Sequence, residues 1–322
     1  MLFIEDYSKA LEFHQKVLLC WLKIKIHGVA KTDNICDYCG EKECKNNGTE
    51  THKFFFSNET KLFFTFDIIE RLISGTPVEL LKIANSYKNN KGIEPNKSEI
   101  EKLFKTSGYT NFYQKKHGKD FINLLNRSTC TYCNRNYTLN ISTNHASSQL
   151  DHWFPKSMFP ILALSFFNLI PSCGSCNHMK GQSDKNYDWW KNNSLTEMLH
   201  PYFPDNNENF KFDFTYRENS DEFIVKFRDV TGNKILQTLN FNLTKKIYQA
   251  HSQLELKDLY NLRKKYTKNY IEFLLQKLHQ DEPSDEEKYR LLFGIEKNQN
   301  DYHKRPFSKF KNDIIEKLLE IE

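Results

Sequence analysis

Cysteine and polar residues that could support hydrolysis occur in order between residues 130 and 180. They are Cys130, Cys133, Asp151, His152, Asn168, Cys173, Cys176, Asn177 and Lys180. Carboxylate, imidazole, amide and amine groups can together hold a divalent cation, take a proton from water and neutralise a phosphate. The set therefore predicts phosphodiester hydrolysis beside a thiolate metal site.

The two CxxC pairs have the spacing of a structural zinc site. Structural Zn²⁺ is commonly held by four thiolates in a tetrahedron, and CxxC is a short ligand pair. We expect Cys130, Cys133, Cys173 and Cys176 to share one zinc ion. That zinc would be structural, because four protein ligands leave no open coordination position. The alternative is four buried free cysteines.

The polar residues between and after these pairs have separable roles. His152 would be the general base, because a neutral imidazole accepts a proton at cellular pH. Asp151 would be an oxygen ligand of a catalytic Mg²⁺ or Mn²⁺ ion, and the Asn177 side-chain carbonyl would be another. Asn168 would hold the loop that presents the base, and Lys180, one helical turn beyond Asn177, would contact a phosphate. Taken singly, residues of these types are more often surface or turn residues.

The same stretches resemble the HNH (His-Asn-His) nuclease family. Its pattern combines a CxxC, an Asp-His pair, a central Asn-Leu, and a second CxxC followed by His or Asn and then Lys. The matching stretches are Cys130–Cys133, Leu150–His152, Asn168–Leu169 and Cys173–Gly181. The resemblance implies a ββα-metal fold, in which two strands and a helix hold one divalent ion beside a structural zinc. It also implies Asp151 and Asn177 as ligands of that ion, His152 as general base and Asn168 as its orienting residue.

One position departs from the commonest family pattern. Asn177 stands where the family often has histidine, and His178 is its neighbour. The spacing to Lys180 favours Asn177 as the matching residue. Residues 151–157 and 171–173 are similar to HNH proteins of bacterial anti-phage systems of the Septu and retron-associated type, which act beside an ATPase partner.

This resemblance implies an HNH endonuclease that cleaves DNA as the effector of a defence complex with an ATPase partner, with RNA not excluded as the substrate. Two alternatives remain open. One is a zinc-stabilised nucleic-acid-binding protein without cleavage activity, and the other is an adaptor whose helical flanks bind the ATPase. A basic cluster at 115–119 would follow DNA, although a solvated helix face also explains such clusters.

A second cysteine group lies nearer the N-terminus. Cys36, Cys39 and Cys44, with His52 downstream, could close a second zinc site, and His27 competes as the fourth ligand. The alternative is a loop of reduced, partly exposed cysteines. Clustered CxxC pairs without an apparent export signal or membrane span favour metal ligation in a reducing compartment, so we expect a cytoplasmic protein.

Patterning predicts an α+β fold, and the length suggests about two domains. The 322 residues include 26 Phe and 16 Tyr, and the net charge of +5 is a mild bias towards polyanions. We expect a mostly helical region at 1–125, the HNH core at 126–200, and a β-meander followed by C-terminal helices at 201–322. The expected helices are 8–26, 66–73, 77–87, 97–105, 254–278 and 307–320, and the expected meander strands are 210–216, 223–227 and 235–239.

Overall fold

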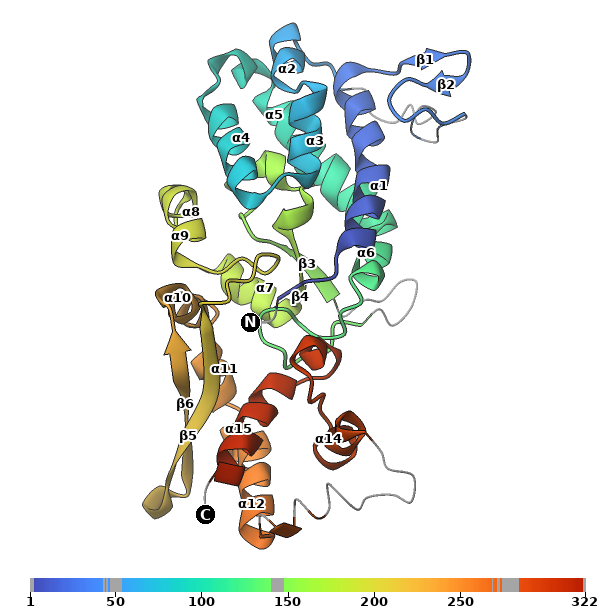
Figure 1. Ribbon diagram of the computed structural model, residues 1–322. Helices are drawn as coiled ribbons and strands as arrows, with labels where there is room; N and C mark the ends of the chain where they lie inside the picture. The colour runs from blue at the N-terminus through green and yellow to red at the C-terminus, as the bar shows by residue number, and fades with distance from the viewer. Residues whose placement is uncertain are drawn as a thin grey trace.

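The computed structural model describes residues 3–42, 44, 46, 54–139, 148–267, 269–270, 273 and 284–320. Within these residues the strands form three antiparallel pairs, β1–β2, β3–β4 and β5–β6, and the rest of the regular structure is helical. Figure 1 shows a helical layer at one end, β3 and β4 in the middle, and the long β5–β6 pair at the other end. The predicted α+β class is confirmed.

The N-terminal helices are α1 Ser8–His27, α2 Asn58–Phe63, α3 Phe66–Ser74, α4 Pro77–Asn89 and α5 Lys97–Glu101. Helices α1, α3 and α4 lie where the sequence predicts them, α2 is not predicted, and the helix expected at 97–105 is α-helical only to Glu101. The side chains of Ser57, Thr65 and Thr76 each accept a backbone N–H at the start of α2, α3 and α4, which satisfies donors that the helix leaves unpaired. Between α1 and α2 lies the short pair β1 (Lys31–Thr32) and β2 (Ile35–Cys36).

A long π-helix, Lys102–Gln114, follows α5 and leads to α6 (Gly118–Leu124). π-Helical segments are usually single turns and often occur at functional sites. Here the segment packs tightly, because a Cβ atom on Gly108 would lie 2.7 Å from a methyl carbon of Leu164. The hydroxyl of Tyr109 donates to the backbone oxygen of Leu150 at 2.9 Å, which ties the π-helix to β3.

Strands β5 (Asn209–Arg217) and β6 (Glu222–Thr231) form the hairpin that the aromatic alternation predicts. Phe214 is opposite Val225 in the register, and the two side chains are buried. The hairpin therefore turns one face towards the core and leaves the other polar, as expected for an antiparallel pair.

The predicted third strand of the meander is wrong. Residues 235–239 belong to helix α10 (Asn233–Phe241), so the sheet ends with β6. Ile235 and Leu239 are both buried, and their spacing of four residues fits a helical face as well as a strand. The carboxylate of Glu208 accepts the backbone N–H of Ile235 at 2.7 Å and caps the helix. That long-range cap is not visible in the local pattern.

The C-terminal half contains further helices. Their bounds are α8 Tyr187–Asn192, α9 Ser194–Glu197, α11 Thr244–Gln249, α12 Lys257–Lys265, α14 Asp285–Phe293 and α15 Ser308–Glu320. The helix predicted at 307–320 is confirmed. One continuous helix over 254–278 is wrong, because α12 ends at Lys265 and Tyr266 has extended dihedral angles. Residues 274–283 lie outside the described part.

Buried apolar side chains from all three predicted regions join one hydrophobic core, which extends from Ile4 to Leu318. The division into domains at 125 and 200 stays a prediction. No helix among the described residues is long and apolar enough to cross a lipid bilayer.

Candidate functional site

The predicted site residues between 148 and 181 lie on or beside two strands and the helix that follows them. Strand β3 (Ser148–His152) pairs antiparallel with β4 (Leu169–Cys173), with Ser148 opposite Cys173 and His152 opposite Leu169. Helix α7 (Gly174–Gly181) begins directly after β4 and packs against both strands. Side chains of β3 and α7 can therefore meet in one place.

The four predicted cysteines of this unit form one cluster. The Sγ atoms of Cys130, Cys133, Cys173 and Cys176 all lie within 4.8 Å of one another, and all four residues are buried. The sulfur atoms of Cys133 and Cys173 are 4.0 Å apart. A tetrahedron with Zn–S bonds of about 2.3 Å separates its sulfur atoms by roughly 3.8 Å, so the cluster could bind zinc. Such an ion would fix the 130–133 loop to the junction of β4 and α7.

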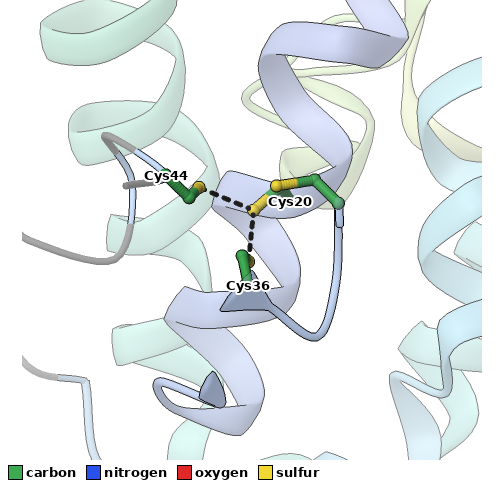
Figure 2. Close-up of side chains that lie close together, drawn as sticks. Cys20, Cys36 and Cys44 are labelled. Carbon is green, nitrogen blue, oxygen red and sulfur yellow. Dashed lines mark hydrogen bonds between the residues drawn. The ribbon is translucent and has the colours of Figure 1, made fainter. Parts of the chain in front are cut away.

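A second cluster joins Cys20 of α1 to Cys36, Cys39 and Cys44, whose Sγ atoms also lie within 4.8 Å of one another. Figure 2 shows the sulfur of Cys20 facing those of Cys36 and Cys44, each at 3.5 Å. These separations also suit four thiolates around one zinc ion. Cys39 is exposed and the other three are buried, so the cluster lies at the surface of α1.

The fourth member of this cluster is not one that the sequence predicts. Cys20, and not His27, is the fourth member, and the Nε2 of His27 lies 2.7 Å from the backbone oxygen of Phe64. His52, the other predicted ligand, lies outside the described residues. Cys20 could have been found, because three clustered cysteines require a fourth ligand and Cys20 shares the buried face of α1 with Ile24. Its distance along the chain from Cys36 concealed it.

Replacing Cys20 with serine is expected to lower the zinc content of the purified protein from two ions per chain to one. A hydroxyl is a poor replacement for a thiolate on Zn²⁺, and three remaining ligands leave the site open to water. Mass spectrometry of the native protein measures the zinc content. The matched control, Ile24→Val, changes the same helix face and should retain both ions. If the Cys20→Ser protein still binds two zinc ions, the fourth ligand of this cluster is a residue other than Cys20.

Asp151 is held by two hydrogen bonds to the same carboxylate oxygen. Its Oδ2 accepts from the hydroxyl of Tyr132 and from the ammonium of Lys180, each at 2.6 Å. The side chains of Asp151 and Lys180 are only 8% and 6% exposed. This is a buried ion pair, in which each charge depends on the other because water is excluded.

Lys180 lies inside the protein. Its Nζ also donates to the backbone oxygen of His152, and the rings of Tyr132, Trp153 and Trp190 have their centroids 5.5–5.9 Å from it. Burial lowers the pKa of Lys180, and the carboxylate of Asp151 opposes that shift. The predicted contact of Lys180 with a phosphate stays a prediction, but in this structure its charge is bound to Asp151.

His152 has a defined tautomer and a neutral ring. Its Nε2 is 3.1 Å from the backbone oxygen of Ala163, which can only accept, so Nε2 carries the proton and Nδ1 is left as the acceptor. The ring of Tyr109 packs against the imidazole with centroids 4.3 Å apart. Burial and the charge of Lys156 lower the pKa of His152 to about 3, so the ring is neutral at cellular pH.

Asn168 is fully buried and binds the segment that follows His152. Its Oδ1 accepts the N–H of Phe154 at 2.6 Å, and its Nδ2 donates to the backbone oxygens of Leu162 at 2.8 Å and Phe154 at 3.2 Å. The backbone oxygen of Asn168 accepts the N–H of Trp153 at 2.9 Å. These bonds fix the chain immediately after the imidazole, which is the geometry that a positioning residue requires.

Asn177 contacts β3 two residues before Asp151. Its Nδ2 donates to the side-chain oxygen of Gln149 at 2.7 Å. Gln149 and Asp151 lie on one face of the strand, because successive side chains of a strand alternate between its faces. Asn177 and Lys180, three residues apart on α7, both point towards that face. His152, the next residue, points to the opposite face, as the alternation requires. Among the described residues no hydrogen bond joins Asp151, His152 and Asn177 directly.

Tyr109, Tyr132 and Lys156 are residues near the site to which the sequence assigns no role. Tyr132 lies inside the first CxxC, and its hydroxyl donates to Asp151. Its position between the two cysteines is the only sign in the sequence that it belongs to the site. Tyr109 comes from the π-helix, far from the motif along the chain. Its contact with His152 depends on the three-dimensional packing alone.

A partial similarity to a known protein was found. Over 71 residues the chain is 31% identical to the Septu protein PtuB of Bacillus thuringiensis, and this stretch covers 21% of the chain and 26% of that protein. The chain thus spans about a quarter of the length of the curated relative that it matches. No protein-family model matches the chain. No solved structure matches it either.

Proposed function

We propose that this chain is a metal-dependent endonuclease with a ββα-metal core of the HNH type. The observation that supports it most is the arrangement of β3, β4 and α7. They present Asp151 and Asn177 on one face of β3, with the neutral imidazole of His152 next along the strand. A cluster of four cysteines that could bind zinc fixes this unit.

Each polar residue has a role in hydrolysis that agrees with its contacts. Asp151 and Asn177 offer the carboxylate and amide oxygens that suit Mg²⁺ or Mn²⁺. Such an ion, when bound, neutralises charge on the phosphate and lowers the pKa of water. His152 accepts a proton at Nδ1, because its Nε2–H is directed to Ala163. Asn168 holds the segment after His152 in place.

Similarity to a Septu protein supports a role in anti-phage defence. We assign the chain as the DNA-cleaving effector of such a system, with an ATPase as its partner and RNA as an alternative substrate. Purification of the chain from its native operon would recover the partner. Recovery of the chain alone would count against an ATPase partner.

One observation favours the alternative of a zinc-stabilised nucleic-acid-binding or adaptor protein without cleavage activity. The ammonium of Lys180 lies 2.6 Å from Oδ2 of Asp151, where it neutralises the carboxylate that a metal ion requires. Binding of nucleic acid without hydrolysis would then be the whole activity. A cleavage assay separates the two functions.

His152→Ala is expected to lower the rate of plasmid cleavage in Mg²⁺ or Mn²⁺ by about 10²–10⁴-fold, the usual contribution of a general base. The control is His178→Ala, which removes an exposed imidazole one residue beyond Asn177. It should cleave at the wild-type rate. Equal cleavage rates for the wild type and His152→Ala would show that His152 is not the general base. A loss of cleavage in His178→Ala would show that His178, and not Asn177, is the last residue of the HNH pattern.

A further inference from the structure

A second lysine lies beside the site, and its charge is not neutralised by the protein. Lys156 is exposed and follows His152 by four residues, on the segment that Asn168 anchors. Within the described ranges no carboxylate oxygen lies within 4.0 Å of its Nζ. Lys180 differs in both respects, because it is buried and paired with Asp151.

Tyr109 places this ammonium next to the general base. The Nζ of Lys156 lies 4.7 Å from the centroid of the Tyr109 ring, which is a cation–π contact. The same ring packs against His152 with centroids 4.3 Å apart, and the Tyr109 hydroxyl bonds to Leu150. One side chain of the π-helix therefore holds β3, the imidazole and the ammonium in fixed relation.

The charges around Lys156 also suit an anion. Its ammonium interacts electrostatically with both Asp151 and His152, so it lies close to the residues proposed to act in hydrolysis. Partial burial and the charge of Lys105 lower the pKa of Lys156, whereas Asp151 raises it. Lys105 is itself paired with Glu101 at 3.1 Å. Lys156, by contrast, is exposed and has no such carboxylate partner among the described residues, so its ammonium could pair with a phosphate.

We propose that Lys156 binds the scissile phosphate, and that Lys180 instead positions the carboxylate of Asp151. This inference rests on the proposed phosphodiester hydrolysis and changes which lysine contacts the substrate. An exposed lysine can bind a phosphate without leaving a buried charge unpaired. Withdrawal of Lys180 towards a phosphate would leave Asp151 buried without its cation.

The experiment compares Lys156→Met, Lys156→Arg and the control Lys297→Met. The control removes the same charge from another lysine that lies over a tyrosine ring, because the Nζ of Lys297 is 5.1 Å from the centroid of Tyr289 in the C-terminal region. Unlike Lys156, Lys297 is paired with a carboxylate, that of Asp285, at 2.7 Å. Cleavage kinetics are measured on a short DNA duplex in Mn²⁺. Binding of the same duplex is measured by fluorescence anisotropy at several salt concentrations without added Mg²⁺ or Mn²⁺ and without a chelator, with each change placed in the His152→Ala protein.

Lys156→Met is expected to lower kcat/KM by at least about ten-fold, the loss for one charge-assisted hydrogen bond. It should also make the plot of log binding constant against log salt shallower by about 0.9, because one phosphate contact is removed. Lys156→Arg should retain most of the activity and the steeper slope. Lys297→Met should match the wild type in both measurements.

Two failures are distinguishable. If the wild type and Lys156→Met cleave DNA at the same rate and have the same salt slope, Lys156 does not bind the phosphate. The nuclease proposal would then remain intact. No cleavage by the wild type under any of these conditions overturns the nuclease proposal, and the role of Lys156 in hydrolysis is then wrong as well. Zinc content and melting temperature, measured for each variant, show that the fold is unchanged.

Discussion

Cys173→Ser is expected to release the zinc of the central cluster and to unfold the β3–β4–α7 unit. Cys173 is the last residue of β4 and immediately precedes α7, so its thiolate joins both elements to Cys130 and Cys133. Structural zinc contributes about 10–16 kcal/mol of apparent binding free energy in small zinc domains. That is comparable with the roughly 5–15 kcal/mol by which whole domains are stable. Loss of the ion therefore leaves this part of the chain without sufficient stability.

Zinc content by mass spectrometry, thermal melting by circular dichroism and limited trypsin digestion measure this effect. The matched control is Ser172→Ala at the neighbouring residue, whose buried Oγ has no hydrogen-bond partner among the described residues. Removal of that hydroxyl should leave the zinc content and the melting curve close to wild type. Full zinc content and a normal melting curve in Cys173→Ser would show that the four cysteines do not share an ion.

Asp151→Ala is expected to abolish cleavage and also to lower the free energy of unfolding by about 3–5 kcal/mol, the cost of removing one partner of a buried ion pair. From the sequence alone we would expect a catalytic defect with a nearly unchanged melting curve. The structure changes this expectation, because the carboxylate is the partner of Lys180 and both side chains are less than a tenth exposed. Its removal leaves the ammonium buried without a countercharge.

The double variant Asp151→Ala/Lys180→Met separates the two effects. Replacement of both charges by apolar groups is often neutral for stability, so the double variant should regain most of the lost stability and remain inactive. Urea unfolding of the zinc-loaded proteins measures stability, and plasmid cleavage measures activity. A stable, inactive Asp151→Ala would mean that Lys180 does not need Asp151. An unstable double variant would point to the Tyr132–Asp151 hydrogen bond instead.

Contiguous motifs explain why much of the site could be predicted. The cysteine pairs, Asp151 and Asn168 lie in short segments whose spacing is set by the chain itself. The sequence therefore identifies the central cluster and the segments that become β3, β4 and α7. Cys20 could not be assigned to its cluster in this way, because it lies on a helix and only the fold brings it to Cys36.

The features that the sequence does not predict depend on which side chains are buried and which distant residues they contact. Residues 235–239 fit both a strand and a helix, and the distant carboxylate of Glu208 favours the helix. The sequence predicts Lys180 as the phosphate contact and assigns no role to Lys156. Only the structure shows that one ammonium is enclosed by three aromatic rings and the other faces solvent.

The shared oxygen of Asp151 has a thermodynamic consequence. A divalent ion and the ammonium of Lys180 would draw on the same negative charge, so each weakens the hold of the other. Removal of the ammonium, as in Lys180→Met, would end that competition and should therefore raise the affinity of Asp151 for a divalent ion. The affinity of the proposed ion site would thus depend on a lysine that is not itself a ligand.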